Sequence, residues 1–242
     1  MKSPEELFKE REQRINDAVS LKEPDRVPLA PYAQFFPARY GGLTCGEAMY
    51  YYDRLTGAWK KTVIDFQWDA APPAHIMLPG RVFDLLDLKL FKWPGHGLPE
   101  EVSFQFVEAE YMKAEEYSEI LGNLGEFVVR KLLPRFAGAL ESFTTFPDFS
   151  LIIRGYNIFR TAALVASSPD FVQSMEAFME AGQEVKIWGS KIAELHRDLT
   201  SIGFPILFMA FAQSPFDIVS EFLRGFRGSS LDMYKNPEEL LA

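Results

Sequence analysis

Phe204-Pro205-Ile206-Leu207-Phe208-Met209-Ala210-Phe211 is a continuously apolar run that directly follows Gly203. A run of this length without polar alternation is typical of a parallel strand that is covered on both faces. The segment before it starts at Ser168-Pro169-Asp170 and carries a broad apolar stripe up to Leu195, which predicts a long helix. A helix followed by a buried strand predicts an α/β protein built from βαβ units.

Three further segments are predicted to be strands because they are short, apolar and bounded by turn residues. They are Val27 to Tyr32, Val63 to Trp68 and Ser103 to Tyr111. Capping boxes at Ser3-Pro4-Glu5-Glu6 and Thr44-Cys45-Gly46-Glu47 each predict the start of a helix. Lys92 to Pro99 contains two prolines and two glycines, so we expect a loop there.

The composition excludes several classes of partner. With a formal net charge of −9 at pH 7, the chain lacks the basic field that binding to nucleic acid requires. Cys45 is the only cysteine, so no internal disulfide forms, and no stretch approaches the ~20 apolar residues that span a bilayer. The charged start is unlike a signal peptide. We therefore expect a cytoplasmic protein with a small-molecule substrate, without nucleic-acid or membrane partners, and compatible with a homo-oligomer.

Four stretches resemble, in the same order, motifs of the uroporphyrinogen decarboxylase superfamily. Arg14 to Ala18, together with Glu23 to Pro28, resembles the family's opening helix and its PDRVP turn. Val107 to Tyr117 resembles the EYM and EEY segment of uncharacterised members. Gly203 to Asp217 resembles a strand with its substrate-facing turn, and Leu223 to Glu239 resembles a helix end and the start of the next helix.

This resemblance implies a (β/α)8 barrel of the uroporphyrinogen decarboxylase type, with the active site at the C-terminal ends of the strands. Members divide between decarboxylation of porphyrinogens and transfer of a methyl group from a corrinoid carrier to a thiol. The helix that starts at Asn236-Pro237 stops after about a turn and a half, which predicts an incomplete barrel. We therefore expect residues 1–242 to form one truncated barrel domain.

Three positions separate the chain from true decarboxylases. The family's RQAGRY segment corresponds to Gln34 through Tyr40, where Arg39 keeps the second arginine but Phe35 stands at the first. No acid follows Asp69-Ala70-Ala71 where the resemblance implies a pyrrole-binding aspartate, and Glu221 stands where decarboxylases have a tyrosine. Guanidinium forks are needed to hold the substrate's carboxylates. Methyl transfer is therefore favoured over decarboxylation of a uroporphyrinogen-like tetrapyrrole.

Methyl transfer to a thiol is usually assisted by zinc held by histidine and cysteine ligands. Cys45, His75, His96 and His196 include no pair at ligand spacing, so we expect no cofactor in this chain. Zinc and a corrinoid partner belong to the prediction only if a longer parent protein is a methyltransferase.

The candidate catalytic residues are two histidines. His75 follows the strand predicted to end at Trp68, where the active-site loops of a barrel begin, and His96 lies in the predicted proline- and glycine-rich loop. A structural or merely exposed histidine explains either position equally, so both alternatives stay open.

The candidate substrate-binding residues flank the predicted strands. Two glutamates spaced two apart share one face of a strand, and such carboxylates can divide acid and base roles. Exposed strand charges and helix capping by Ser214 or Asp217 explain some of the same residues without a site. We assign substrate binding to Tyr32, Gln34, Arg39, Glu108, Glu110, Gln213 and Asp217.

A third class of function is a non-catalytic binding or assembly subunit. An open barrel exposes strand edges and apolar surface, and these must pair with something.

Overall fold

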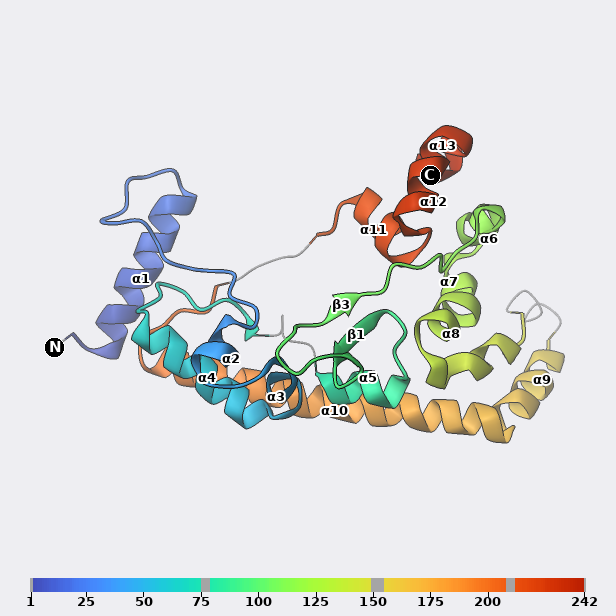
Figure 1. Cartoon of the computed structure of the whole chain (residues 1–242), viewed down its shortest axis with the longest axis horizontal. Helices are drawn as coiled ribbons and strands as arrows, with labels where there is room; N and C mark the ends of the chain where they lie inside the picture. Colours follow the sequence, from blue (N-terminus) through green and yellow to red (C-terminus); the bar gives the residue numbers. More distant parts are fainter. Residues whose placement is uncertain (1, 75–78, 149–154, 208–211, 242) are drawn as a thin grey trace. The chain divides into compact units, whose positions relative to one another are not determined.

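A computed structural model describes residues 2–74, 79–148, 155–207 and 212–241, and most of them are helical (Figure 1). The chain forms two compact units. The first unit comprises Met1–Arg81, Trp93–Ser103 and Glu184–Phe211, and the second comprises Val82–Lys92, Phe104–Gln183 and Ala212–Ala242. Each unit has its own buried side chains.

The first unit is built mainly from helices that begin at well-formed caps. Its helices are α1 (Pro4–Val19), α2 (Phe36–Tyr40), α3 (Cys45–Tyr50), α4 (Tyr52–Asp65) and the part of α10 (Pro169–Ser201) from Glu184 onward. Both predicted capping boxes are confirmed, at Ser3 for α1 and at Thr44 for α3. Leu55, Trp59 and Val63 recur every four residues along α4 and are fully buried.

The second unit contains many short helices around aromatic side chains. These are α5 (Gly80–Leu86, shared at its start), η2 (Ala114–Glu116), α6 (Tyr117–Gly122), α7 (Leu124–Phe127), the π-helical turn η3 (Val128–Leu132), α8 (Leu133–Phe136), η4 (Gly138–Thr145), α9 (Asn157–Ala166), α11 (Pro215–Phe222), α12 (Gly225–Lys235) and α13 (Pro237–Leu241). One buried cluster gathers Tyr111, Met112, Tyr117, Phe127 and Leu132. A second joins Phe143 and Phe171, whose rings stack with centroids 5.3 Å apart.

One small mixed sheet has the strand order β2-β1-β3. Strand β1 (Phe91–Pro94) pairs in parallel with β2 (Gly97–Leu98) and antiparallel with β3 (Gln105–Phe106). The predicted loop from Lys92 to Pro99 is thus wrong in part, because residues 92–94 belong to β1 and Gly97–Leu98 form β2. Gly95, with a positive φ, lies in the turn between the two strands.

The predicted (β/α)8 barrel is wrong. A barrel needs eight parallel strands, whereas the described residues hold only this three-stranded mixed sheet and isolated bridges among helices and irregular segments. Val63 to Trp68, predicted as a strand, continues α4 to Asp65, because Val63 extends the buried stripe of that helix. Val27 to Tyr32 forms no ladder, and Ser103 to Tyr111 contributes only β3.

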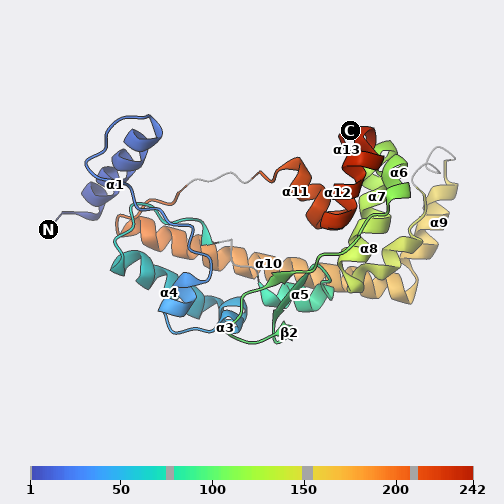
Figure 2. The ribbon, with the colours of Figure 1, turned by 45° about the horizontal axis from the view of Figure 1, so that its top comes forward.

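The predicted strand Phe204 to Phe211 is described only as far as Leu207. There Ile206 forms an isolated parallel bridge with Ala71, and residues 208–211 lie outside the described part. The long helix predicted from Ser168 is confirmed as α10, which Figures 1 and 2 show as one unbroken helix, and the helix start at Asn236-Pro237 is confirmed as α13. Among the described helices, none is both long and apolar enough to cross a membrane.

Candidate functional site

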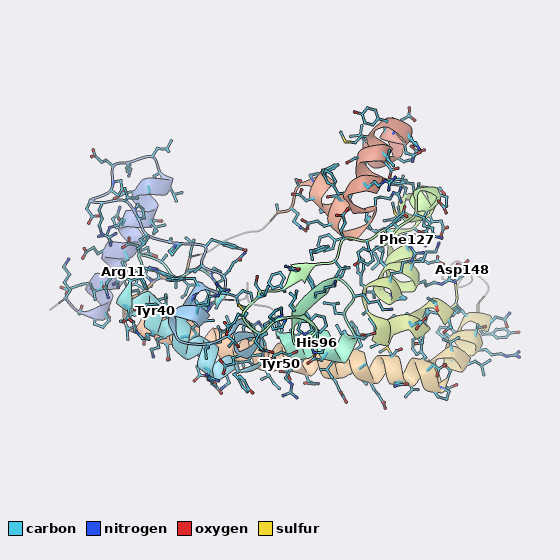
Figure 3. All side chains as sticks on the ribbon, viewed as in Figure 1. Arg11, Tyr40, Tyr50, His96, Phe127 and Asp148 are labelled. Carbon is cyan, nitrogen blue, oxygen red and sulfur yellow. The ribbon has the colours of Figure 1, made fainter. Side chains whose placement is uncertain are left out.

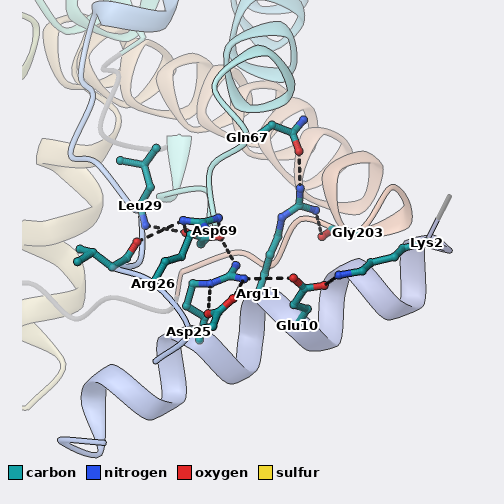
Figure 4. A network of polar contacts seen from close by, with 11 residues as sticks. Lys2, Glu10, Arg11, Asp25, Arg26, Leu29, Gln67, Asp69 and Gly203 are labelled. Atoms are coloured by element: carbon teal, nitrogen blue, oxygen red, sulfur yellow. Dashed lines mark hydrogen bonds and ion pairs between the residues drawn. The ribbon is translucent and has the colours of Figure 1, made fainter. Parts of the chain in front are cut away.

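A buried carboxylate organises the first unit (Figure 4). Asp69 is fully inaccessible to solvent and accepts hydrogen bonds from the Arg14 guanidinium at 2.6 Å and from the Arg26 guanidinium at 2.6 and 2.7 Å. The backbone N–H of Leu29 donates to the same carboxylate at 2.8 Å. A buried charge is tolerated only when it is paired and hydrogen-bonded, and Asp69 meets both conditions.

The pairing extends outward through Arg14, whose side chain is only 4% exposed. Its guanidinium forms a bidentate pair with Asp25, with both N–O distances at 2.6 Å, and also contacts Glu10 at 3.2 Å. Arg14 lowers the pKa of the Asp25 carboxyl to about 2. Glu10 also pairs with Lys2, so three cations face three carboxylates, and the cluster holds the chain in place without presenting a free reagent.

Helix α1 is joined to the start of the apolar run by a second arginine. Arg11 donates to the carbonyl of Gly203 at 2.5 Å and lies over the ring of Phe204, with its guanidinium carbon 3.8 Å from the ring centroid. Gly203 has a φ of +91°, and a Cβ there would meet the Pro4 carbonyl oxygen at 2.7 Å. Both observations require glycine at this position.

The ion pairs of Arg14 and Asp69 join three stretches of the first unit. Arg14 comes from α1, Asp25 and Arg26 from the turn that follows it, and Asp69 from the Asp-Ala-Ala triplet. Gly203, which follows α10, is tied in through Arg11.

Arg39 lines an open cavity of about 480 Å³ in the same unit, together with Gly42, Leu43, Thr44 and Glu101. Its guanidinium donates to the carbonyl oxygen of Glu101 at 2.7 Å and lies 3.9 Å from the Cys45 sulfur. In the part of the chain that the structure describes, no carboxylate forms an ion pair with Arg39. The guanidinium thus keeps donors for an anionic group of a ligand.

The other two predicted residues near Arg39 are accessible. Tyr32 is 55% exposed, and Gln34 is exposed with a positive φ of 41°. Neither lines the Arg39 cavity, so the structure does not bring the three together in one pocket.

The second unit is organised around a buried arginine. Arg224 is 6% exposed and pairs with Asp232, at 2.5 Å, and with Glu110. It also donates to the Met112 carbonyl at 2.8 Å, while Tyr117 donates its hydroxyl to Asp232 at 3.0 Å. Burial, together with the hydrogen bond to Asp232, raises the pKa of the Tyr117 hydroxyl to about 12.

The paired glutamates predicted from the sequence both lie beside the start of α12, but not on a shared strand face. Glu110 contacts Arg224, and Glu108 accepts the backbone N–H of Phe226 at 3.0 Å, a favourable place for a negative charge at a helix start. Each carboxylate has its own partner, so the two do not form an acid–base pair with each other.

The remaining predicted residues of the second unit lie at α11, with Asp217 in its first turn and Gln213 just before its cap. Ser214 accepts the Asp217 N–H at 3.2 Å and caps the helix, and Gln213 donates to Glu221 at 2.9 Å. Gln213 and Asp217 are both exposed.

The structure describes only one of the two predicted catalytic histidines. His75 lies outside the described residues. His96 is exposed, and its ring stacks on Trp93 with centroids 4.4 Å apart (Figure 3). The stack holds the imidazole in the turn between β1 and β2.

No group of three histidine, cysteine or acidic side chains within the described ranges could hold a metal ion. Cys45 is buried against the Glu101 carbonyl, 3.4 Å from its sulfur. The described donors therefore do not fit the zinc set that thiol-methylating enzymes use.

Sequence reasoning missed the ionic centres and an open groove in the second unit. The sequence signal for this groove is the pair Glu126 and Arg130, which are four residues apart, followed by further cations at Lys131 and Arg135.

No protein-family model, curated protein or solved structure matches this chain.

Proposed function

We propose that this chain is an enzyme related in chemistry to the uroporphyrinogen decarboxylase superfamily and that it transfers a methyl group from a corrinoid carrier to a thiol. One observation supports this above all: the superfamily-like segments of the first unit converge on the buried Asp69 carboxylate. Arg14, Arg26 and Asp69 come from distant parts of the sequence, and their contact is expected if these parts form one shared structural framework. The superfamily's barrel is not part of the proposal.

The Arg39 cavity is the proposed place where the substrate is held. Arg39 is the second arginine of the RQAGRY-like segment. Its guanidinium lies at the cavity wall and is held there by a hydrogen bond to the Glu101 carbonyl. Tetrapyrroles and corrinoids both carry carboxylate-derived side arms, and a guanidinium recognises carboxylates through directed hydrogen bonds. Arg39 would thus orient the ligand without entering the reaction.

Methyl transfer is favoured over decarboxylation by the position of Phe35. This residue stands where decarboxylases have their first arginine, and it is only 7% exposed, packed in the core. A second guanidinium clamp is therefore missing at that position. In the proposed step the cobalt–carbon bond breaks with both electrons left on cobalt, the thiol sulfur bonds to the methyl carbon, and the thiol proton passes to solvent. No step is routed through zinc, because the described donors do not fit it.

The proposal is tested by incubating the full chain with methylcobalamin and 2-mercaptoethanol and following the loss of the methyl–cobalt absorbance. We expect protein-dependent turnover that falls about tenfold in Arg39→Gln, the equivalent of about 1.4 kcal/mol. Arg227→Gln is the matched control, because Arg227 is exposed in the other unit. Absence of protein-dependent methyl loss contradicts the proposal.

Decarboxylation remains the second candidate, because the Arg39 guanidinium, which forms no ion pair within the described residues, also suits a polycarboxylate. Incubation with uroporphyrinogen and chromatography of the products measures it directly, and products with fewer carboxylates would replace the methyl-transfer proposal. Binding of either tetrapyrrole without turnover would instead identify a non-catalytic binding subunit. We propose a reducing cytoplasm as the compartment, since the single cysteine is a buried free thiol.

A further inference from the structure

The second unit contains an open groove of about 850 Å³, which is the size range of small-molecule sites. Phe127, labelled in Figure 3, and Pro134 give it an apolar part. The π-helical turn η3 brings Arg130 and Lys131 to its wall. Single π-helical turns occur frequently at functional sites, because they cost regular helical hydrogen bonding.

Most charges of this groove are neutralised within the protein. Glu116 accepts both terminal nitrogens of Arg135, at 2.7 and 2.8 Å, and the Lys131 ammonium at 3.0 Å. Lys131 also reaches Glu119 at 2.5 Å, and Arg130 pairs with Glu126. These pairs rigidify the wall and leave it without net charge.

Two lining charges stand apart from this pairing. Lys89, which follows α5, and Glu141 in η4 both line the groove, and neither forms an ion pair within the described residues. Lys89 is exposed. Among the described lining charges, one cation and one anion are therefore left to meet a ligand.

We propose that the groove binds a zwitterionic ligand with the chemistry of a free amino acid or a short peptide, its carboxylate on Lys89 and its ammonium on Glu141. Electrostatic complementarity supplies the argument: a purely anionic ligand would be repelled by Glu141, and a purely cationic one by Lys89. The apolar surface of Phe127 and Pro134 accommodates the part between the two charged ends. This inference is independent of the proposed methyl transfer.

The test uses three probes that differ only in their end groups: trialanine, N-acetyl-trialanine and trialanine amide. Calorimetric titration of the full chain at pH 7 should show trialanine binding more tightly than either blocked form. Lys89→Gln should weaken trialanine about tenfold and should not weaken the amide, which has no carboxylate for Lys89 and is freed from its repulsion. Glu141→Gln should weaken trialanine about tenfold and should not weaken the acetylated form, which has no ammonium for Glu141 and is freed from its repulsion.

Matched controls are Lys92→Gln and Glu115→Gln, which remove exposed charges of the same unit outside the groove. Both should bind all probes as the unchanged protein does. Free alanine distinguishes an amino-acid ligand from a peptide, because it carries the charges without the intervening length. No trialanine binding, or equal loss for all probes in Lys89→Gln, overturns the proposal.

Discussion

The two units solve the burial of charge in opposite ways. The first places a carboxylate, Asp69, at the centre and surrounds it with Arg14 and Arg26. The second places a guanidinium, Arg224, at the centre and surrounds it with Asp232 and Glu110. Each centre ties together segments that are far apart in sequence. The two centres differ in which ion-pair and hydrogen-bond partners the surrounding groups would keep if the central residue were replaced.

In the first unit the surrounding groups have other partners. Arg14 keeps the bidentate pair with Asp25 without Asp69, and Arg26 is about half exposed, so water can solvate it. In the second unit Asp232 is 2% exposed, and among the described residues only the neutral donors of Tyr117 and Asn236 remain without Arg224. The second centre should therefore be the less tolerant of substitution.

Replacing the central arginine should give the largest effect. Arg224→Met leaves Asp232 buried without a cation, and breaking a buried pair costs about 3–5 kcal/mol. Hydrogen exchange followed by mass spectrometry measures this as lost protection of α12 and of the segment around Met112. Restoring charge balance in Arg224→Met with Asp232→Asn should recover part of the loss, and a single variant as protected as the unchanged protein contradicts the comparison.

Acid should expose a second difference between the units. Arg135 is the largest cause that lowers the pKa of the Glu116 carboxyl, from 4.5 to about 2. Because the folded-state pKa lies below the unfolded one, the stabilisation is complete above about pH 4.5 and is lost as the pH falls toward 2. It amounts to about 3 kcal/mol.

Hydrogen exchange of the second unit between pH 5 and 2.5 measures this loss, after correction for intrinsic exchange rates. Glu116→Gln should be less protected at pH 5 and should lose less on acidification. Asp25 has a similarly lowered pKa in the first unit but is exposed, so 1 M salt should weaken its contribution much more than that of Glu116. An equal effect of salt on both units would remove this distinction.

Replacing the central carboxylate should have a smaller effect. Asp69→Asn keeps an acceptor for the Leu29 N–H but removes the charge, and we expect a loss of about 2 kcal/mol because Arg14 retains Asp25. All four tryptophans lie in the first unit, so their fluorescence during urea unfolding reports on it. Glu23→Gln, an exposed charge of the same unit, should change the free energy of unfolding by less than about 0.5 kcal/mol. A loss larger than that of Arg224→Met would reverse the comparison.

Local signals in the sequence predicted the helix starts well and the barrel badly. The caps at Ser3 and Thr44 involve residues only three apart, so the pattern contains the whole interaction. Val63 to Trp68 was predicted as a strand because a short apolar run does not distinguish a strand from a helix end. The buried stripe of Leu55 and Trp59 continues to Val63 and decides for the helix.

The ionic centres could not be predicted from local pattern. Arg14 and Asp69 are 55 residues apart, and Arg224 and Glu110 are 114 apart. The spacing along the chain predicts neither ion pair, because both pairs arise from tertiary packing. For the candidate site, Arg39 was found because it stood in a motif-like segment. Lys89 and Glu141 lie in no motif-like segment, and they are identified as candidates only because both line the groove.

The smallest expected effect compares helix caps of the two units. In the first, Thr44 accepts the Glu47 N–H at 2.9 Å, and the Glu47 side chain accepts the Thr44 N–H at 3.0 Å. In the second, Ser214 accepts the Asp217 N–H at 3.2 Å, and no described side chain of α11 returns a bond to the Ser214 N–H.

Thr44→Ala should destabilise the first unit by about 1 kcal/mol, and Ser214→Ala the second by about 0.5 kcal/mol, because only the first cap satisfies two backbone donors. Urea unfolding by tryptophan fluorescence measures the first, and hydrogen exchange of α11 measures the second. Thr44→Ser restores the cap and is the control, while a loss in Ser214→Ala that exceeds the one in Thr44→Ala would show that reciprocity adds nothing.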